Sequence, residues 1–181
     1  LIAEDFSGSA IPVGWQGSKV AFSIVEGGLR GLAAPDDSHG PAIGRAISGH
    51  DLVVEFDLKF VRPGYFLFLI DGDSQFKGRA HLLRFSIGGN QYQLAQDRGD
   101  PAFYRIEQLA RGTAKPVLNE WQHIRIELRG NQANAWFGDK AKLTATGTVW
   151  NVKKSRIVFL IAQTGDVRID NVKVVGLVRN N

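Results

Sequence analysis

The sequence of 181 residues contains neither cysteine nor methionine. The absence of cysteine excludes disulfide bonds, thiolate metal ligands and a cysteine nucleophile. Because the first residue is Leu1 rather than methionine, we expect that a preceding segment, such as a signal peptide, has been removed. The length suits one domain, and we expect a single domain over residues 1–181.

Long apolar runs and clustered charges are also missing. The longest apolar runs, which include residues 65–70, are far shorter than the roughly 18 residues of a membrane-spanning helix. The 22 basic and 18 acidic residues are interspersed, and no basic stretch is interleaved with aromatic residues. None of the four histidines has the spacing of a zinc pair. We therefore expect no membrane span and no nucleic-acid partner.

The sequence is instead rich in short segments in which apolar and polar side chains alternate. Residues 52–60, 81–87 and 122–129 each show this period of two, which is typical of strands with one buried face. Many of the 21 glycines fall between such segments, as turns do. The residues expected between two packed sheets are Val54, Phe56, Leu58, Phe60, Phe85, Ile124, Ile126, Leu128, Phe159 and Ile161.

This pattern predicts an all-β domain built as a two-sheet antiparallel β-sandwich. Glycine-containing turns at 88–90 and 130–131 predict two hairpins. Residues 103–110 are compatible with either a short helix or an irregular strand. In the last segment, Val167 and Ile169 share one parity while Val172 and Val174 share the other, which predicts a β-bulge at Asp170-Asn171.

Three segments resemble a known group of proteins. They are Glu4-Asp5-Phe6-Ser7-Gly8 with Gly14-Trp15, the stretch at 119–131 that opens Asn119-Glu120-Trp121, and Ile169-Asp170-Asn171-Val172. Together they resemble concanavalin A-like jelly rolls, above all the bacterial 3-keto-disaccharide hydrolase-like domains. The resemblance implies a jelly roll with paired first and last strands, in a bacterial protein that is secreted to the extracellular space or periplasm and has carbohydrate as its partner.

Candidate ligand-binding residues gather in the middle third of the chain, where aromatic, carboxylate and arginine side chains suit sugar recognition. Several fall in expected loops at strand ends, where function concentrates. The alternative is that the Asp-Gly pairs are ordinary turns. The expected substrate-binding residues are Tyr65, Asp71, Asp73, His81, Arg84, Tyr92, Asp97 and Trp150. Trp150 is either an exposed sugar platform or a packed loop residue.

Glu55 and Asp57 lie two residues apart on one face of a strand, as in the Glu-x-Asp-x-Glu motif of laminarinase-type glycosidases. The third position here is Lys59, so the acid/base of that motif is missing. We interpret the pair as part of a solvated strand face.

Jelly rolls of the kind that the chain resembles often hold a structural calcium ion where the first and last strands meet. Asp170, together with Asp5 or Glu4, would supply the hard oxygen ligands that Ca²⁺ prefers. The alternative is that Asp170 caps the bulge or pairs with Arg168.

The sequence leaves three functions open. In the first, the domain binds a saccharide and catalyses no reaction. In the second, it cleaves a di- or polysaccharide as a glycosidase-like hydrolase. In the third, it serves as an adhesion or structural module. Two convergent carboxylates in a pocket would favour an enzyme.

Overall fold

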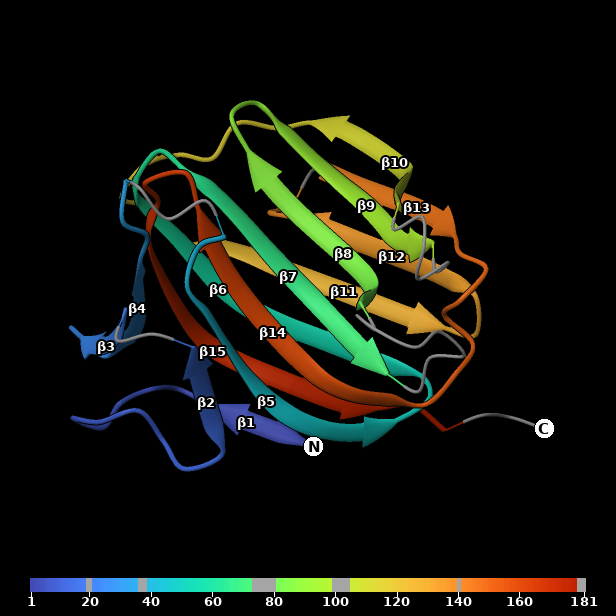
Figure 1. The fold of residues 1–181 in the computed structure, drawn as a ribbon, viewed down its shortest axis with the longest axis horizontal. Helices are drawn as coiled ribbons and strands as arrows, with labels where there is room; N and C mark the ends of the chain where they lie inside the picture. The colour runs from blue at the N-terminus through green and yellow to red at the C-terminus, as the bar shows by residue number, and fades with distance from the viewer. Residues whose placement is uncertain (19–20, 36–38, 73–80, 99–104, 140, 179–181) are drawn as a thin grey trace.

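A computed structural model describes residues 1–18, 21–35, 39–72, 81–98, 105–139 and 141–178. All regular elements in these ranges are β-strands, which form two sheets stacked face to face (Figure 1). The described residues include no helix with the length and hydropathy that a membrane crossing requires. The predicted two-sheet antiparallel sandwich is confirmed.

One sheet contains eight strands in the order β13-β12-β11-β6-β15-β4-β3, with β1 paired to the end of β15. Their bounds are β1 (Ile2–Glu4), β3 (Phe22–Val25), β4 (Gly28–Leu32), β6 (Leu52–Arg62), β11 (Gln122–Arg129), β12 (Gln132–Phe137), β13 (Ala141–Thr146) and β15 (Asp166–Gly176).

The other sheet contains seven strands in the order β10-β9-β8-β7-β14-β5-β2, and it faces the viewer in Figure 1. Their bounds are β2 (Trp15–Ser18), β5 (Ala42–Gly49), β7 (Tyr65–Gly72), β8 (His81–Gly88), β9 (Gln91–Arg98), β10 (Arg105–Thr113) and β14 (Lys154–Ala162). The strands are antiparallel to their neighbours in both sheets.

The core lies between the sheets, and every residue predicted for it from the alternation is at most 1% exposed. Its centre is aromatic. The Phe56 ring from the eight-stranded sheet lies 5.4 Å from Phe68 and 5.1 Å from Phe159 of the facing sheet, measured between ring centroids. Burying side chains of this size supplies the main driving force for joining the sheets.

The local predictions for turns and chain ends are also confirmed. Hairpins join β8 to β9 and β11 to β12. The ambiguous segment is a strand over Arg105–Thr113, with a bulge between Gln108 and Ala110. β1 pairs with β15 through Glu4 and Val172, and the register of β15 against β6 shifts between Asp170 and Lys173, as the predicted bulge requires.

Candidate functional site

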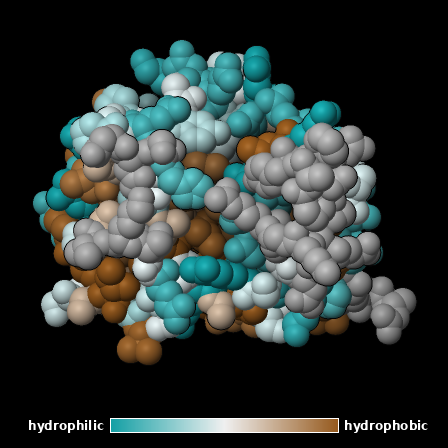
Figure 2. Space-filling view, viewed as in Figure 1, coloured by the Kyte–Doolittle hydropathy of each residue, from teal (hydrophilic) through white to brown (hydrophobic). Residues whose placement is uncertain are grey.

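The outward face of the seven-stranded sheet carries a hollow of about 360 Å³. Its floor is apolar: Leu160 on β14 is partly exposed, and Leu69 on β7 and Val158 on β14 beside it are 1% and 5% exposed. Val158 is the cross-strand partner of Leu69, so these side chains stand side by side on the sheet. Figure 2 shows this face of the molecule, where apolar atoms are visible in the middle and along the left edge and hydrophilic atoms along the top.

The rim of the hollow is polar, with Gln16, Asp71, His81 and Arg156 among its lining residues. They come from β2, β7, β8 and β14, which are distant in sequence but close in the order of the sheet. A ligand lying on the apolar floor would therefore meet hydrogen-bonding groups on its edges.

Asp71 and His81 form the closest polar pair of this rim. They are cross-strand partners at the end of β7 and the start of β8, next to a register shift after Ile70. The His81 Nδ1 lies 2.5 Å from the Asp71 Oδ1, and both side chains are about four-fifths buried, at 21% and 19% exposed. The carboxylate fixes the orientation of the imidazole, whose Nε2 is the ring nitrogen that Asp71 does not engage.

Arg84 and Asp97 lie beside the hollow on the same face of the sheet. Arg84 on β8 is the cross-strand partner of Leu69, and it donates through Nε to the Asp97 Oδ1 and through Nη2 to the Oδ2. Tyr65 is the first residue of β7, and its hydroxyl accepts a hydrogen bond from the Gln93 Nε2 at 3.1 Å. The predicted residue Asp73 lies outside the described residues.

Two of the predicted substrate-binding residues belong to the core instead. Tyr92 is 4% exposed and packs between Phe85 and Phe137, and burial raises the pKa of its hydroxyl. The alternation along β9 gives the reason, because Tyr92 shares its parity with the buried Leu94. The prediction that Tyr92 binds a ligand is wrong.

Trp150 is fully buried, and its indole Nε1 donates a 2.7 Å hydrogen bond to the Leu82 backbone oxygen. A platform for a sugar needs an exposed ring face, which Trp150 lacks. The prediction of Trp150 as a ligand-binding residue is therefore wrong, and the alternative of a packed residue is confirmed.

Sequence reasoning missed Gln16, Leu69, Arg156, Val158 and Leu160 as parts of the hollow. A signal was present on β14. Its core-facing residues Ile157 and Phe159 alternate with Val158 and Leu160, so the strand is apolar on both faces. A strand of this kind is covered on both sides or carries an apolar binding surface on one of them.

Glu55 and Asp57 lie on the outer face of the eight-stranded sheet, away from the hollow. Glu55 pairs with Arg125, and Asp57 pairs with the His123 Nδ1 at 2.9 Å. These contacts agree with the interpretation of a solvated strand face.

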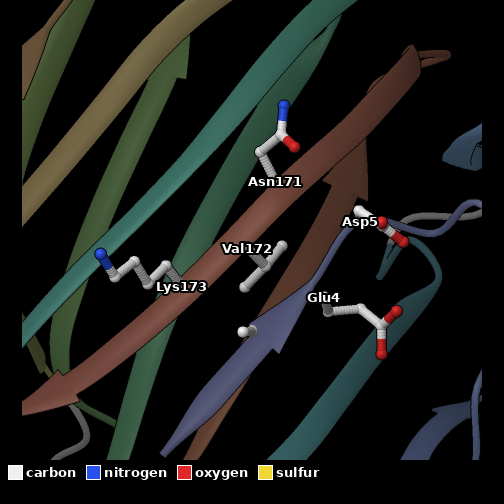
Figure 3. A pocket seen from close by; sticks show the side chains of 6 residues that line it. Glu4, Asp5, Asn171, Val172 and Lys173 are labelled. Carbon is white, nitrogen blue, oxygen red and sulfur yellow. The ribbon is translucent and has the colours of Figure 1, made fainter.

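A second hollow, of about 400 Å³, lies where the first and last strands meet (Figure 3). Its lining includes Glu4, Asp5, Asn171 and Lys173, whereas Asp170 does not line it. The Glu4 Oε2 accepts a hydrogen bond from Arg45 at 3.3 Å. Burial, and secondly the negative charges of Asp57 and Asp5, raise the pKa of Asp170. Among the described residues, no three His, Cys, Asp or Glu side chains are grouped so as to hold a metal ion.

Comparison with known proteins identifies the fold. No protein-family model and no curated protein matches the sequence. Solved structures do match over nearly the whole chain, and together with the two sheets they show that the protein has the concanavalin A-like jelly-roll fold.

The carbohydrate-binding module CBM66 from Bacillus subtilis matches with a TM-score of 0.68 and 14% identity, over 89% of this chain and 94% of that one. A protein of unknown function with a galectin-like fold from Bacillus subtilis matches with a TM-score of 0.73 and 14% identity, over 99% and 97%. The laminarinase from Rhodothermus marinus matches with a TM-score of 0.73 and 9% identity, over 99% and 97%.

Proposed function

We propose that this protein binds a saccharide in the hollow on the outward face of its seven-stranded sheet. The observation that carries the proposal is the combination of an apolar floor and a polar rim in one hollow. Sugar rings have an apolar face of C–H groups and an edge of hydroxyls, so the two parts of the hollow match the two parts of the ligand.

The similarity of the fold supports the same proposal, because the solved structures that match include a carbohydrate-binding module and a laminarinase. Under this proposal the domain acts outside the cell or in the periplasm, where polysaccharides are met. A glycan array that includes di- and polysaccharides would identify the ligand.

A matched pair of variants tests whether the hollow is the binding site. Leu160→Glu places a charge on the apolar floor, and Val175→Glu places the same charge on the outer face of the other sheet, where Val175 is 39% exposed. We expect the first variant to lose saccharide binding and the second to keep it. Binding that survives Leu160→Glu in a folded protein would contradict the proposal.

Hydrolysis is the second candidate, and the Asp71–His81 pair is the observation that favours it. A retaining glycosidase needs two carboxylates roughly 5–5.5 Å apart. Among the described residues, Asp71 is the one carboxylate that lines the hollow. Non-catalytic binding is therefore the better supported function, and an assay for products from the saccharides found on the array separates the two. Product formation by the wild-type protein that is lost in His81→Ala would show that the protein is an enzyme.

We also propose a calcium ion where β1 meets β15, held by Asp5 and Asp170. A cation there would relieve the repulsion among Asp5, Asp57 and Asp170, which contributes to the raised pKa of Asp170. Because these carboxylates are few, backbone carbonyls and water would supply most of the six to eight ligands that Ca²⁺ takes. We expect Ca²⁺ to raise the melting temperature of protein treated with EGTA, since a ligand bound by the native state alone stabilises it. An unchanged melting temperature would contradict the proposal.

A further inference from the structure

Arg156 brings a positive charge to the hollow, and among the described residues no carboxylate lies within ion-pair distance of its guanidinium. Its cross-strand partner on β7 is Asp71, but the Asp71 carboxylate is bonded to His81 instead. Within the described residues, the guanidinium of Arg156 makes one hydrogen bond, from Nη2 to the Gln16 backbone oxygen at 3.4 Å. The side chain is exposed, so its remaining donors are available to a ligand.

The guanidinium of Arg156 lies along the surface of the sheet, in the direction of β2. Arg156 extends from β14 across β5 toward Gln16 on β2, and it passes over Gly44. A Cβ atom at position 44 would lie 2.6 Å from the Arg156 Nε, which is closer than a real contact. The missing side chain of Gly44 therefore leaves the space in which the guanidinium lies. The planar guanidinium of Arg156 lies beside the floor formed by Val158 and Leu160. It would therefore contact one edge of a sugar ring that lies on that floor.

We infer that the hollow selects an anionic saccharide, one that carries a uronic-acid carboxylate or a sulfate ester. The inference rests on the proposed function and specifies its ligand. A guanidinium presents two parallel N–H groups that match a carboxylate or sulfate, and such charge-assisted bonds are stronger than those to a hydroxyl. A neutral sugar would offer only hydroxyl groups to the Arg156 guanidinium and would form no bond between opposite charges. The net charge of +4 adds a weaker, long-range attraction for anionic ligands.

The experiment compares ligands that share a sugar backbone and differ in the presence of the anionic group. Isothermal titration calorimetry would measure binding of oligogalacturonate beside its methyl ester, and of a sulfated dextran oligosaccharide beside plain dextran. We expect the anionic member of one pair to bind at least about tenfold more tightly, a ratio equivalent to about 1.4 kcal/mol. The pair that shows the preference identifies the anionic group as carboxylate or sulfate.

Three variants assign the preference to Arg156. Arg156→Gln should abolish the ratio of affinities within a pair, because it removes the charge that distinguishes the anionic member from the neutral one. Arg156→Lys keeps the charge but not the two parallel donors, and it should reduce the ratio in part. Arg129→Gln is the matched control, because Arg129 is exposed on the outer face of the other sheet and bonds Glu127. It should keep the full ratio.

The outcomes separate this inference from the proposed function. Equal binding of both members of each pair, with loss of both in Leu160→Glu, would overturn the anionic preference and uphold saccharide binding in the hollow. Equal reduction of the ratio by Arg156→Gln and Arg129→Gln would assign the preference to net charge and overturn the role of Arg156. Absence of binding to any saccharide would overturn the proposed function, and the inference with it.

Discussion

Arg84 and Asp97 form a two-bond ion pair on neighbouring strands, with an Nε–Oδ1 distance of 2.5 Å and an Nη2–Oδ2 distance of 3.2 Å. The two side chains are 12% and 5% exposed. Both were expected to bind a ligand, yet each charged group is already occupied by the other. The pair lies beside the hollow, next to Leu69. It links β8 to β9 in the sheet whose outward face forms the floor of the hollow.

We predict that Asp97→Ala destabilises the protein by about 3 kcal/mol, because it leaves the largely buried guanidinium of Arg84 without its partner. Urea unfolding would measure the loss. The double variant Arg84→Met/Asp97→Leu removes both charges and should recover much of the stability. If the double variant were as unstable as Asp97→Ala, packing rather than the unpaired charge would be the cause.

Trp150 offers a test of its role in the core. Trp150→Phe removes the indole N–H and with it the buried hydrogen bond to the Leu82 carbonyl, and we expect a loss of about 1–3 kcal/mol in the free energy of unfolding. Trp121→Phe is the control, because Trp121 is 44% exposed. Equal effects of the two substitutions in chemical denaturation would contradict the structural role given to Trp150.

Gly40 allows a close approach between two segments. Its φ is +65°, and a Cβ there would lie 1.9 Å from the Ile161 backbone oxygen. Gly40→Ala should therefore cost about 2–5 kcal/mol from backbone strain and overpacking. Gly89→Ala shares the positive φ, at +60°, but its Cβ would meet no atom within 4 Å, so it should cost about 1 kcal/mol. Thermal unfolding of the two variants measures the difference, and similar melting temperatures would contradict it.

Asp170 makes stability depend on pH. Burial, and then the charges of Asp57 and Asp5, raise its pKa above the ordinary value of 3.8. The folded state thus binds the proton more tightly than the unfolded state does. The stability from this group is fully present below pH 3.8, and it is lost as the pH rises through the raised pKa.

We therefore expect Asp170→Asn to be more stable than the wild type at pH 7 in EGTA, with a difference that disappears below pH 3.8. Asp139→Asn, in the exposed turn after β12, is the control. Urea unfolding at several pH values would show the effect. A difference that stays constant with pH would point to a cause other than the titration of Asp170.

The sequence by itself determined which faces of the strands are buried, because the side chains of a strand alternate with a period of two. Val54, Phe56 and Ile124 lie between the sheets for that reason. The change of parity in the last strand likewise determined the bulge after Asp170. A shift of register allows both Val167 with Ile169 and Val172 with Val174 to be buried.

The tertiary structure decided which strands stand side by side, and with them the hollow. Gln16, Leu69, His81 and Arg156 meet because the sheet places β2, β5, β14, β7 and β8 in that order. Nothing local in the sequence specifies this order, because antiparallel neighbours can come from distant parts of the chain. The same applies to Trp150, whose hydrogen bond to Leu82 spans 68 residues and exists only after the strands have assembled.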